Sequence, residues 1–172
     1  MNKGKDASTM MSRLLPKMLL GIGLLLLAAC QTMADHGGWT RAQVAALRSG
    51  GFVKTERGWE FGMQDRLLFA TDASDIRTEQ VGVIRSITGR LVAVGIRRAQ
   101  VEGHADDTGT ARHNDALSVR RATAVADAMA GGGMLRGNIL VEGLGDRYPI
   151  ESNATAQGRQ ENRRVVILIA AP

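Results

Sequence analysis

Cysteine, proline and aromatic side chains are scarce in this chain of 172 residues. Cys30 is the only cysteine, so no intramolecular disulfide can form. There are three prolines, and aromatic residues make up 3%, so a core has to be built mainly from Val, Ile, Leu and Ala. With 44% hydrophobic and 23% charged residues, the composition still indicates one globular domain of ordinary size plus shorter segments.

A strong positive charge is also missing once the N-terminal residues are set aside. The formal net charge is +5, but residues 1–29 hold four basic residues against one acidic residue, a net of +3. The remaining 18 basic and 16 acidic groups leave a net of +2, which gives no electrostatic case for binding nucleic acid. Lys54 is the only lysine after residue 29, against seventeen arginines. A GC-rich genome explains this bias as readily as a need for bidentate contacts with carboxylates.

No hydrophobic run is long enough for a membrane-spanning helix, which needs about 20 residues. The apolar run Met18–Leu27 follows a basic stretch, so residues 1–29 are predicted to be a secretory signal peptide. The run ends Leu27-Ala28-Ala29-Cys30, which resembles the lipobox of bacterial lipoproteins. The alternative is ordinary secretory cleavage before an incidental cysteine. The resemblance implies that Cys30 carries diacylglycerol and an N-acyl chain, and that Gln31 directs the protein to the outer membrane, facing the periplasm.

Residues 30–58 are predicted to be a lipidated N-terminus and a linker with some local order. Thr40 is placed to cap a short helix through Arg48, with Val44 and Leu47 on one side. Fully extended, the linker spans at most roughly 100 Å. Val44, Leu47 and Phe52 either fold back on the following domain or pair with a second chain in a homodimer.

Residues 59–172 predict one α+β domain. Strands are expected at 59–69, 98–103, 138–144 and 165–170, and helices at 78–93 and 114–129. The continuous apolar run 165–170 is typical of a central strand covered by helices. The order β-α-β-α-β-β, with a long polar loop before the last strand, indicates a sandwich of one mixed sheet with helices packed on one face.

The second predicted helix places a guanidinium near its apolar side. Arg121 lies four residues after Leu117, on the same face. A half-buried arginine needs a carboxylate partner, and Asp106 in the preceding loop is the nearest candidate, with Asp107 and Asp115 as rivals. The pair is either a structural ion pair or a split site for a zwitterion. In the second case Arg121 takes a ligand carboxylate and Asp106 its ammonium.

Four spaced motifs resemble one known family. Gly103-His104-Ala105-Asp106 and the run Asn114–Ala122 are similar to the OmpA-like peptidoglycan-binding domain, whose signature is G-H-T-D followed by N-x-x-L-S-x-x-R-A. The stretches Gly143–Gly145 and Asn162–Val165 agree as well. The resemblance covers about 110 residues and implies the OmpA-like fold.

In that family the positions of Asp106 and Arg121 hold the free amino acid end of diaminopimelate in the peptidoglycan stem peptide. The resemblance implies the same role here, with Asn114 supporting the pocket. In the zwitterion interpretation, the helix N-terminus near Asn114 adds backbone N–H donors for an anion. Ala105 replaces the family's threonine, which removes a hydroxyl beside Asp106. His104 lacks the companion ligands of a metal site, as do His36 and His113, so neither metal nor cofactor is expected.

The segments Cys30-Gln31-Thr32, Gly51-Phe52 and Gly58–Met63 resemble the YfiB-type outer-membrane lipoproteins. Those proteins sequester a small periplasmic repressor, YfiR, and thereby release a diguanylate cyclase that makes c-di-GMP. The resemblance therefore implies a YfiR-like partner. The alternative is a plain envelope anchor like the peptidoglycan-associated lipoprotein of the Tol system. An enzyme is not expected, because neither the two cleft carboxylates of a glycosidase nor the zinc ligands of an amidase are visible.

Overall fold

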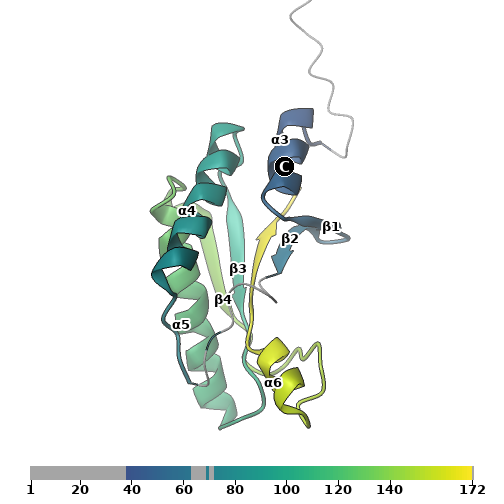
Figure 1. The fold of residues 1–172 in the computed structure, drawn as a ribbon, viewed down its shortest axis with the longest axis vertical. Coiled ribbons are helices and arrows are strands. Elements are labelled where there is room, and N and C mark those ends of the chain that lie inside the picture. Colours follow the sequence, from purple (N-terminus) through teal and green to yellow (C-terminus); the bar gives the residue numbers. More distant parts are fainter. Residues whose placement is uncertain (1–37, 63–68, 70–71, 172) are drawn as a thin grey trace, which may run out of the picture. The chain divides into compact units, whose positions relative to one another are not determined.

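The computed structural model describes residues 38–62, 69 and 72–171. These residues form one mixed sheet with the strand order β1-β2-β5-β3-β4 (Figure 1). Strands β3 and β4 are parallel, and the other neighbours are antiparallel. The strands are β1 Val53–Thr55, β2 Gly58–Gly62, β3 Ala99–Gly103, β4 Ile139–Gly143 and β5 Val165–Ile169. The predicted mixed sheet is confirmed, and the apolar strand β5 is its central strand, as expected.

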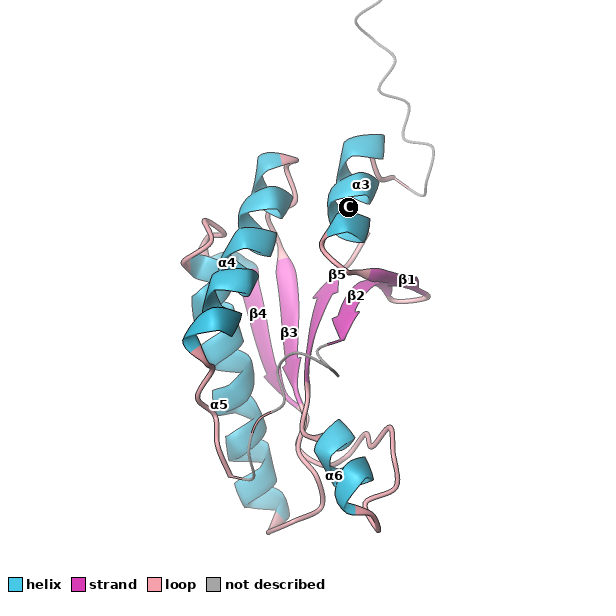
Figure 2. Ribbon diagram, in the orientation of Figure 1, coloured by secondary structure: helices cyan, strands magenta, loops and turns pink. Residues whose placement is uncertain are grey.

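The described helices are α3 Arg41–Ser49, α4 Thr78–Ala93, α5 Ala111–Ala130 and α6 Ala156–Asn162, with the short 3-10 turn η2 Arg136–Asn138. Helices α4 and α5 cover one face of the sheet (Figure 2). The sequence predicted the bounds of α4, but it started α5 too late. The cap is Thr110, whose hydroxyl accepts from the backbone N–H of His113 at 3.2 Å, so the helix begins three residues before Asn114.

Alternation along the strands separates the two faces of the sheet. Val101 and Ile167 point towards the helices and are fully or almost fully buried beside Leu91 and Val125. Glu102, between Val101 and Gly103, points to the opposite face. The sheet therefore has one face covered by α4 and α5 and one open face, as the sandwich prediction required.

The predicted linker is in part a folded element. Thr40 caps α3 with a capping box, and Val44 and Leu47 are buried, which confirms the short helix. Trp39, Leu47 and Phe52 belong to the same core cluster as the sheet and helices. Of the two alternatives, the apolar residues thus fold back on the domain. The predicted domain boundary at residue 59 is too late, because burying these side chains adds residues 39–58 to the compact unit.

Two further expectations are corrected. The first strand was predicted over residues 59–69, but β2 ends at Gly62 and pairs with the unpredicted strand β1; residues 63–68 lie outside the described residues. The long polar loop before β5 contains helix α6, capped by Thr155. Seven residues with few apolar side chains give almost no periodic signal, which is why this helix was missed.

Helix α5 approaches the sheet most closely where β3 and β4 end. Gly103 and Gly143 lie side by side in register. A Cβ atom built on Gly103 would lie 1.9 Å from the backbone oxygen of Ser118, and one on Gly143 would lie 2.3 Å from a methyl carbon of Val119. Only glycine allows this contact. It holds the first half of α5 against the strand ends from which the candidate site projects.

Candidate functional site

The candidate site is a pocket of about 410 Å³ where β3 ends and α5 begins. Its charged lining includes Asp106, Arg121 and Arg163, and the first turn of α5 with the loop before it forms one wall. The full lining is Asp72, Asp106, Thr108, Gly109, Thr110, His113, Leu117, Arg121 and Arg163. The structure thus brings Asp106 and Arg121 into one pocket, as the zwitterion hypothesis requires.

Asp106 is 5% exposed and is held on both carboxylate oxygens. Oδ2 lies 2.6 Å from Nη1 of Arg163, and Oδ1 accepts a hydrogen bond from the backbone N–H of Thr108 at 3.0 Å. Burial alone would raise the pKa of Asp106, but the hydrogen bonds from Arg163 and Thr108 outweigh it and lower the pKa below the ordinary value. The carboxylate is therefore charged at neutral pH and can receive an ammonium group.

Arg121 is fully buried, which is rare for arginine and marks a position with a special role. Its Nε donates to the backbone oxygen of Ala73 at 2.9 Å, and its Nη1 donates to that of His104 at 3.2 Å. The guanidinium carbon lies 5.1 Å from the ring centre of Phe69. Burial, together with the nearby charge of Arg163, lowers the pKa of Arg121 to about 10, so it remains protonated at neutral pH.

The ion-pair partner of Asp106 differs from the predicted one. The sequence interpretation joined Asp106 to Arg121, but the 2.6 Å ion pair is with Arg163, and the charge of Asp106 acts on Arg121 through the pocket. Among the rivals, Asp115 pairs with Arg147 at 2.7 Å, and Asp107 is exposed and does not line the pocket. Arg163 was missed as a site residue because 42 residues separate it from Arg121, and no spacing rule joins them.

Asn114 lies behind the pocket and does not line it. It is 1% exposed, and its Nδ2 donates to the backbone oxygen of Asp106 at 3.0 Å and to Oδ2 of Asp146 at 2.9 Å. Its backbone N–H bonds to the oxygen of Thr110 inside the helix, so it is not a donor for a ligand. Asn114 therefore holds the loop that carries Asp106, and its supporting role in binding stays a prediction.

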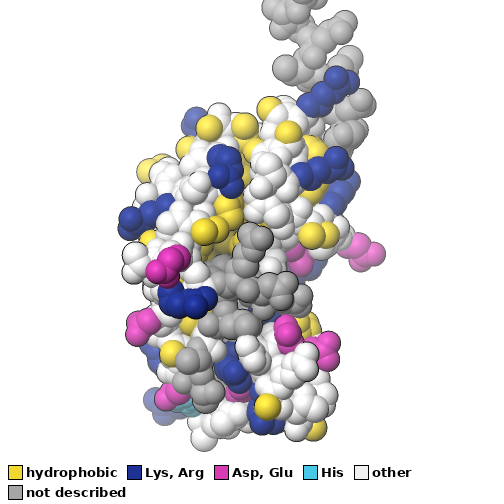
Figure 3. Space-filling model, in the orientation of Figure 1, with side chains coloured by type: hydrophobic (Ala, Val, Ile, Leu, Met, Phe, Trp, Pro, Cys, Tyr) yellow, Lys and Arg dark blue, Asp and Glu magenta, His cyan; other side chains and the backbone are white. Residues whose placement is uncertain are grey.

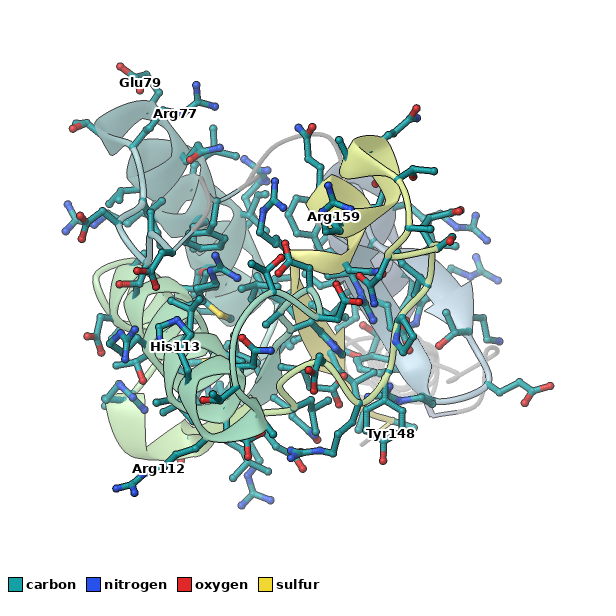
Figure 4. The ribbon with its side chains drawn as sticks, turned by 90° about the horizontal axis from the view of Figure 1, so that it is seen from below. Arg77, Glu79, Arg112, His113, Tyr148 and Arg159 are labelled. Carbon is teal, nitrogen blue, oxygen red and sulfur yellow. The ribbon has the colours of Figure 1, made fainter. Side chains whose placement is uncertain are left out.

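The other predicted residues divide between two sides of the molecule. His113 lies at the rim of the pocket, 2.9 Å from Oδ1 of Asp72. His104 instead lines a groove of about 730 Å³ on the open face of the sheet, as does Tyr148 (Figure 4 labels His113 and Tyr148). Ala105 is buried, and its backbone N–H donates to the oxygen of Gly145 at 2.8 Å. Cys30 and His36 lie outside the described residues.

The described part of the chain contains neither a metal-binding cluster nor a membrane-spanning helix. Over residues 38–62, 69 and 72–171, no three His, Cys, Asp or Glu side chains come together as they would around a metal ion. Within the same ranges, no helix is both long and apolar enough to cross a membrane.

Residues 68–163 match the OmpA family, and this stretch is more than half of the chain. The chain belongs to the OmpA family. It is 42% identical to the protein named YfiB of Escherichia coli K12 over 86% of this chain and 92% of that one. It is 39% identical to the outer-membrane lipoprotein YfiB of Pseudomonas aeruginosa over 92% and 97% of the two chains. The predicted resemblance to YfiB-type proteins is thereby confirmed.

Solved structures show the same OmpA-like fold. The cell wall anchor of the type VI secretion system of Pseudomonas aeruginosa has a TM-score of 0.59 and 29% identity, covering 77% of this chain and 96% of that one. The peptidoglycan-associated lipoprotein of Burkholderia pseudomallei has a TM-score of 0.55 and 22% identity, covering 59% and 86%. At 22% identity the second likeness concerns the fold alone.

Proposed function

We propose that this chain is an outer-membrane lipoprotein that binds peptidoglycan non-covalently. The observation that carries the proposal is the placing of Asp106, Arg121 and Arg163 around one pocket. A free amino acid end bears an ammonium and a carboxylate a few ångströms apart. The ammonium suits Asp106, and the carboxylate suits the planar donor fork of an arginine. The free end of diaminopimelate in the stem peptide has this chemistry.

The relatives support the same assignment. Peptidoglycan binding is named for a relative from Mycobacterium tuberculosis that shares 34% identity over 103 residues, or 60% of this chain. That stretch is long enough to contain the Asp106 loop and α5 together. The binding proposed for this pocket is therefore the binding that is named for that relative.

Neighbouring residues offer matched controls for the site. We expect Asp106→Ala and Arg121→Ala to abolish co-sedimentation with purified sacculi, while Asp107→Ala and Arg120→Ala bind normally, because Asp107 and Arg120 are exposed and do not line the pocket. Free diaminopimelate should compete with the wild-type protein. Thermal melting verifies that each variant is folded, since Arg121 is fully buried. Retained binding by the folded Asp106→Ala and Arg121→Ala proteins would refute the site.

We propose that Cys30 carries the lipid and that residues 1–29 are removed as a signal peptide. The lipobox resemblance and the outer-membrane lipoprotein from Pseudomonas aeruginosa support this. Cells labelled with radioactive palmitate should yield a labelled protein, and Cys30→Ser should abolish the label. A labelled Cys30→Ser protein would place the lipid elsewhere.

We further propose that the protein sequesters a YfiR-like periplasmic repressor of a diguanylate cyclase. The support is the likeness to YfiB proteins over nearly the whole chain, α3 and β1 included, and not over the OmpA-like domain alone. Co-purification with the product of a neighbouring repressor gene should be observed. If no such product binds, the plain envelope anchor becomes the better description.

We infer no enzymatic activity for the pocket. Arg163 binds the buried carboxylate of Asp106, and the pKa of Asp106 is lowered. A glycosidase instead needs a carboxylic acid with a raised pKa. The protein should therefore leave the turbidity of isolated sacculi unchanged. Clearing of the suspension would contradict this inference.

A further inference from the structure

One end of the domain carries arginines without acidic partners. Arg41 begins α3, Arg90 lies in the last turn of α4, and Arg97 and Arg98 lie in the loop between α4 and β3. With Arg48 of α3 they make five exposed arginines, here called the basic end. Across the described ranges, the ion pairs involve other basic residues and none of these five.

Two observations link α3 with α4 and the loop that follows it at the basic end. Nε2 of Gln43, in the first turn of α3, donates to the backbone oxygen of Val94 in the loop that leads to Arg97. Arg48 and Arg90 line the same groove of about 550 Å³ between α3 and α4, in which Glu79 is the only acidic lining residue. On the face shown in Figure 3, basic side chains (dark blue) lie around α3 and the end of α4, and the acidic side chains (magenta) lie lower in the view.

Acidic residues are concentrated elsewhere. The topology brings Glu56, in the turn between β1 and β2, and Asp127, in the last turns of α5, towards the basic end. Asp127 is paired with Arg136 at 2.9 Å. The opposite end, which carries the pocket, holds most of the other acidic groups: Asp72, Asp75, Asp106, Asp107, Asp115, Asp146, Glu151 and Glu161. The pocket end also holds arginines, among them Arg112, Arg147 and Arg163, which balance its acidic groups, whereas the arginines of the basic end have no such balance.

The chain enters the domain at the basic end. Gly38, Trp39 and the cap Thr40 come directly before α3, and Cys30 is eight residues before Gly38. Eight residues span at most roughly 30 Å even when fully extended. A lipid on Cys30 would hold the basic end within that distance of the membrane. The arginines of the basic end attract the membrane surface only when they come close to it, because salt screens charges beyond the Debye length of about 8 Å at physiological ionic strength.

We propose that the basic end binds the anionic phospholipid surface of the membrane in which Cys30 is anchored, so that the Asp106 pocket faces away from that membrane. The location rests on the lipidation proposed above, but the binding surface itself does not. A basic residue near an anionic surface contributes about a fivefold gain in binding, equivalent to about 1 kcal/mol. The binding mode is electrostatic and should be lost in high salt.

The test uses the whole mature chain from position 30 with Cys30→Ser, so that no lipid contributes. Vesicles of phosphatidylethanolamine with one quarter phosphatidylglycerol should co-sediment with it at about 10 mM salt, where the Debye length is about 30 Å. Pure phosphatidylcholine vesicles should not. The combination of Arg41→Gln, Arg97→Gln and Arg98→Gln should weaken binding about a hundredfold, which is three fivefold steps.

A second triple variant removes the same charge from the other end. Arg77→Gln, Arg112→Gln and Arg120→Gln change exposed arginines at or near the pocket end (Figure 4 labels Arg77 and Arg112). This variant should bind the anionic vesicles within about threefold of the unchanged chain. Equal weakening by both triples, equal binding to neutral vesicles, or no binding at all would each overturn the proposal. Sacculus binding should survive the first triple, so failure of this proposal is distinguishable from failure of the peptidoglycan proposal.

Discussion

The two faces of the sheet each carry a pocket lined by a buried arginine, but the smaller pocket is the better candidate site. On the helix-covered side, Arg121 and Asp106 line a pocket of about 410 Å³. On the open side, Arg164, Glu102 and His104 line a groove of about 730 Å³. Volume alone would therefore select the open face. The way in which the charged lining residues are paired is therefore more informative about function than the volume of the pocket.

Several charged side chains on the open face are bound by one another or by the backbone, and the lining keeps one carboxylate in excess. Arg57 bonds to Glu102, and the side-chain amide of Gln100 donates to both Glu102 and Glu142 at 2.9 Å. Arg164 donates to the backbone oxygen of Tyr148 at 3.1 Å. Three carboxylates and two guanidiniums line this groove. Two carboxylates, Asp72 and Asp106, and two guanidiniums line the other pocket. Asp72 is exposed and paired with His113, whereas Asp106 and Arg121 are buried and held in position by backbone groups.

The largest difference between the two faces should appear in packing. Gly103→Ala forces a Cβ atom to within 1.9 Å of the backbone oxygen of Ser118, so α5 must move. We expect a loss of about 3 kcal/mol in the free energy of unfolding. Gly62→Ala, at the edge of the open face, meets nothing within 4 Å and should change it by less than about 0.5 kcal/mol. Urea unfolding measures both, and similar losses would show that the two faces are packed alike.

The two buried arginines should differ in binding more than in stability. Arg121→Ala removes a pocket guanidinium and should weaken sacculus binding at least about a hundredfold. Arg164→Ala removes a buried guanidinium from the open groove and should leave binding within about threefold. Both variants should melt at lower temperature, because each loses a hydrogen bond from a buried arginine to the backbone. If Arg164→Ala impairs sacculus binding as strongly, the open groove takes part in recognition.

The sequence predicted those parts of the fold in which a local pattern and the tertiary structure agree. Helix α4 was predicted with the bounds that the structure gives, because Ile84, Ile87 and Leu91 recur at helical spacing and all face the core. The extent of the domain was not predicted. The glycine pairs just before Trp39 and Phe52 look like parts of a linker, and only long-range packing shows that these two side chains are buried.

The two predicted residues that the structure brings into the candidate pocket come from one chain segment, in which a charged side chain falls on an apolar face. Arg121 on an apolar helix face and Asp106 in the preceding loop are 15 residues apart, so a local argument could join them. Arg163 reaches Asp106 across 57 residues, through the antiparallel pairing of β3 with β5. Neither periodicity nor composition encodes such a contact, because it depends on the strand order.

Acid should separate the two faces by the pH at which each loses stability. Burial lowers the pKa of His104, on the open face, to about 3, and the charges of Arg164 and Arg57 act in the same direction. The folded protein therefore keeps this imidazole neutral, whereas the unfolded chain takes up a proton below about pH 6.5. The unfolded state binds more protons in this window, so stability falls as the pH falls.

Between pH 6.5 and 4.5 this linkage amounts to about 2 kcal/mol, and His104→Gln should lack that loss. Asp106 acts in a lower window, because its pKa is depressed in the folded protein. Its contribution is present above the unfolded value near 3.8 and is lost as the pH falls through the folded value, so Asp106→Asn should approach the wild-type stability only in strong acid. Urea unfolding across this range measures both effects. If His104→Gln loses stability with falling pH as steeply as the wild type, the imidazole of His104 takes up its proton in the folded protein. Its surroundings on the open face would then be more hydrated than the helix-covered face.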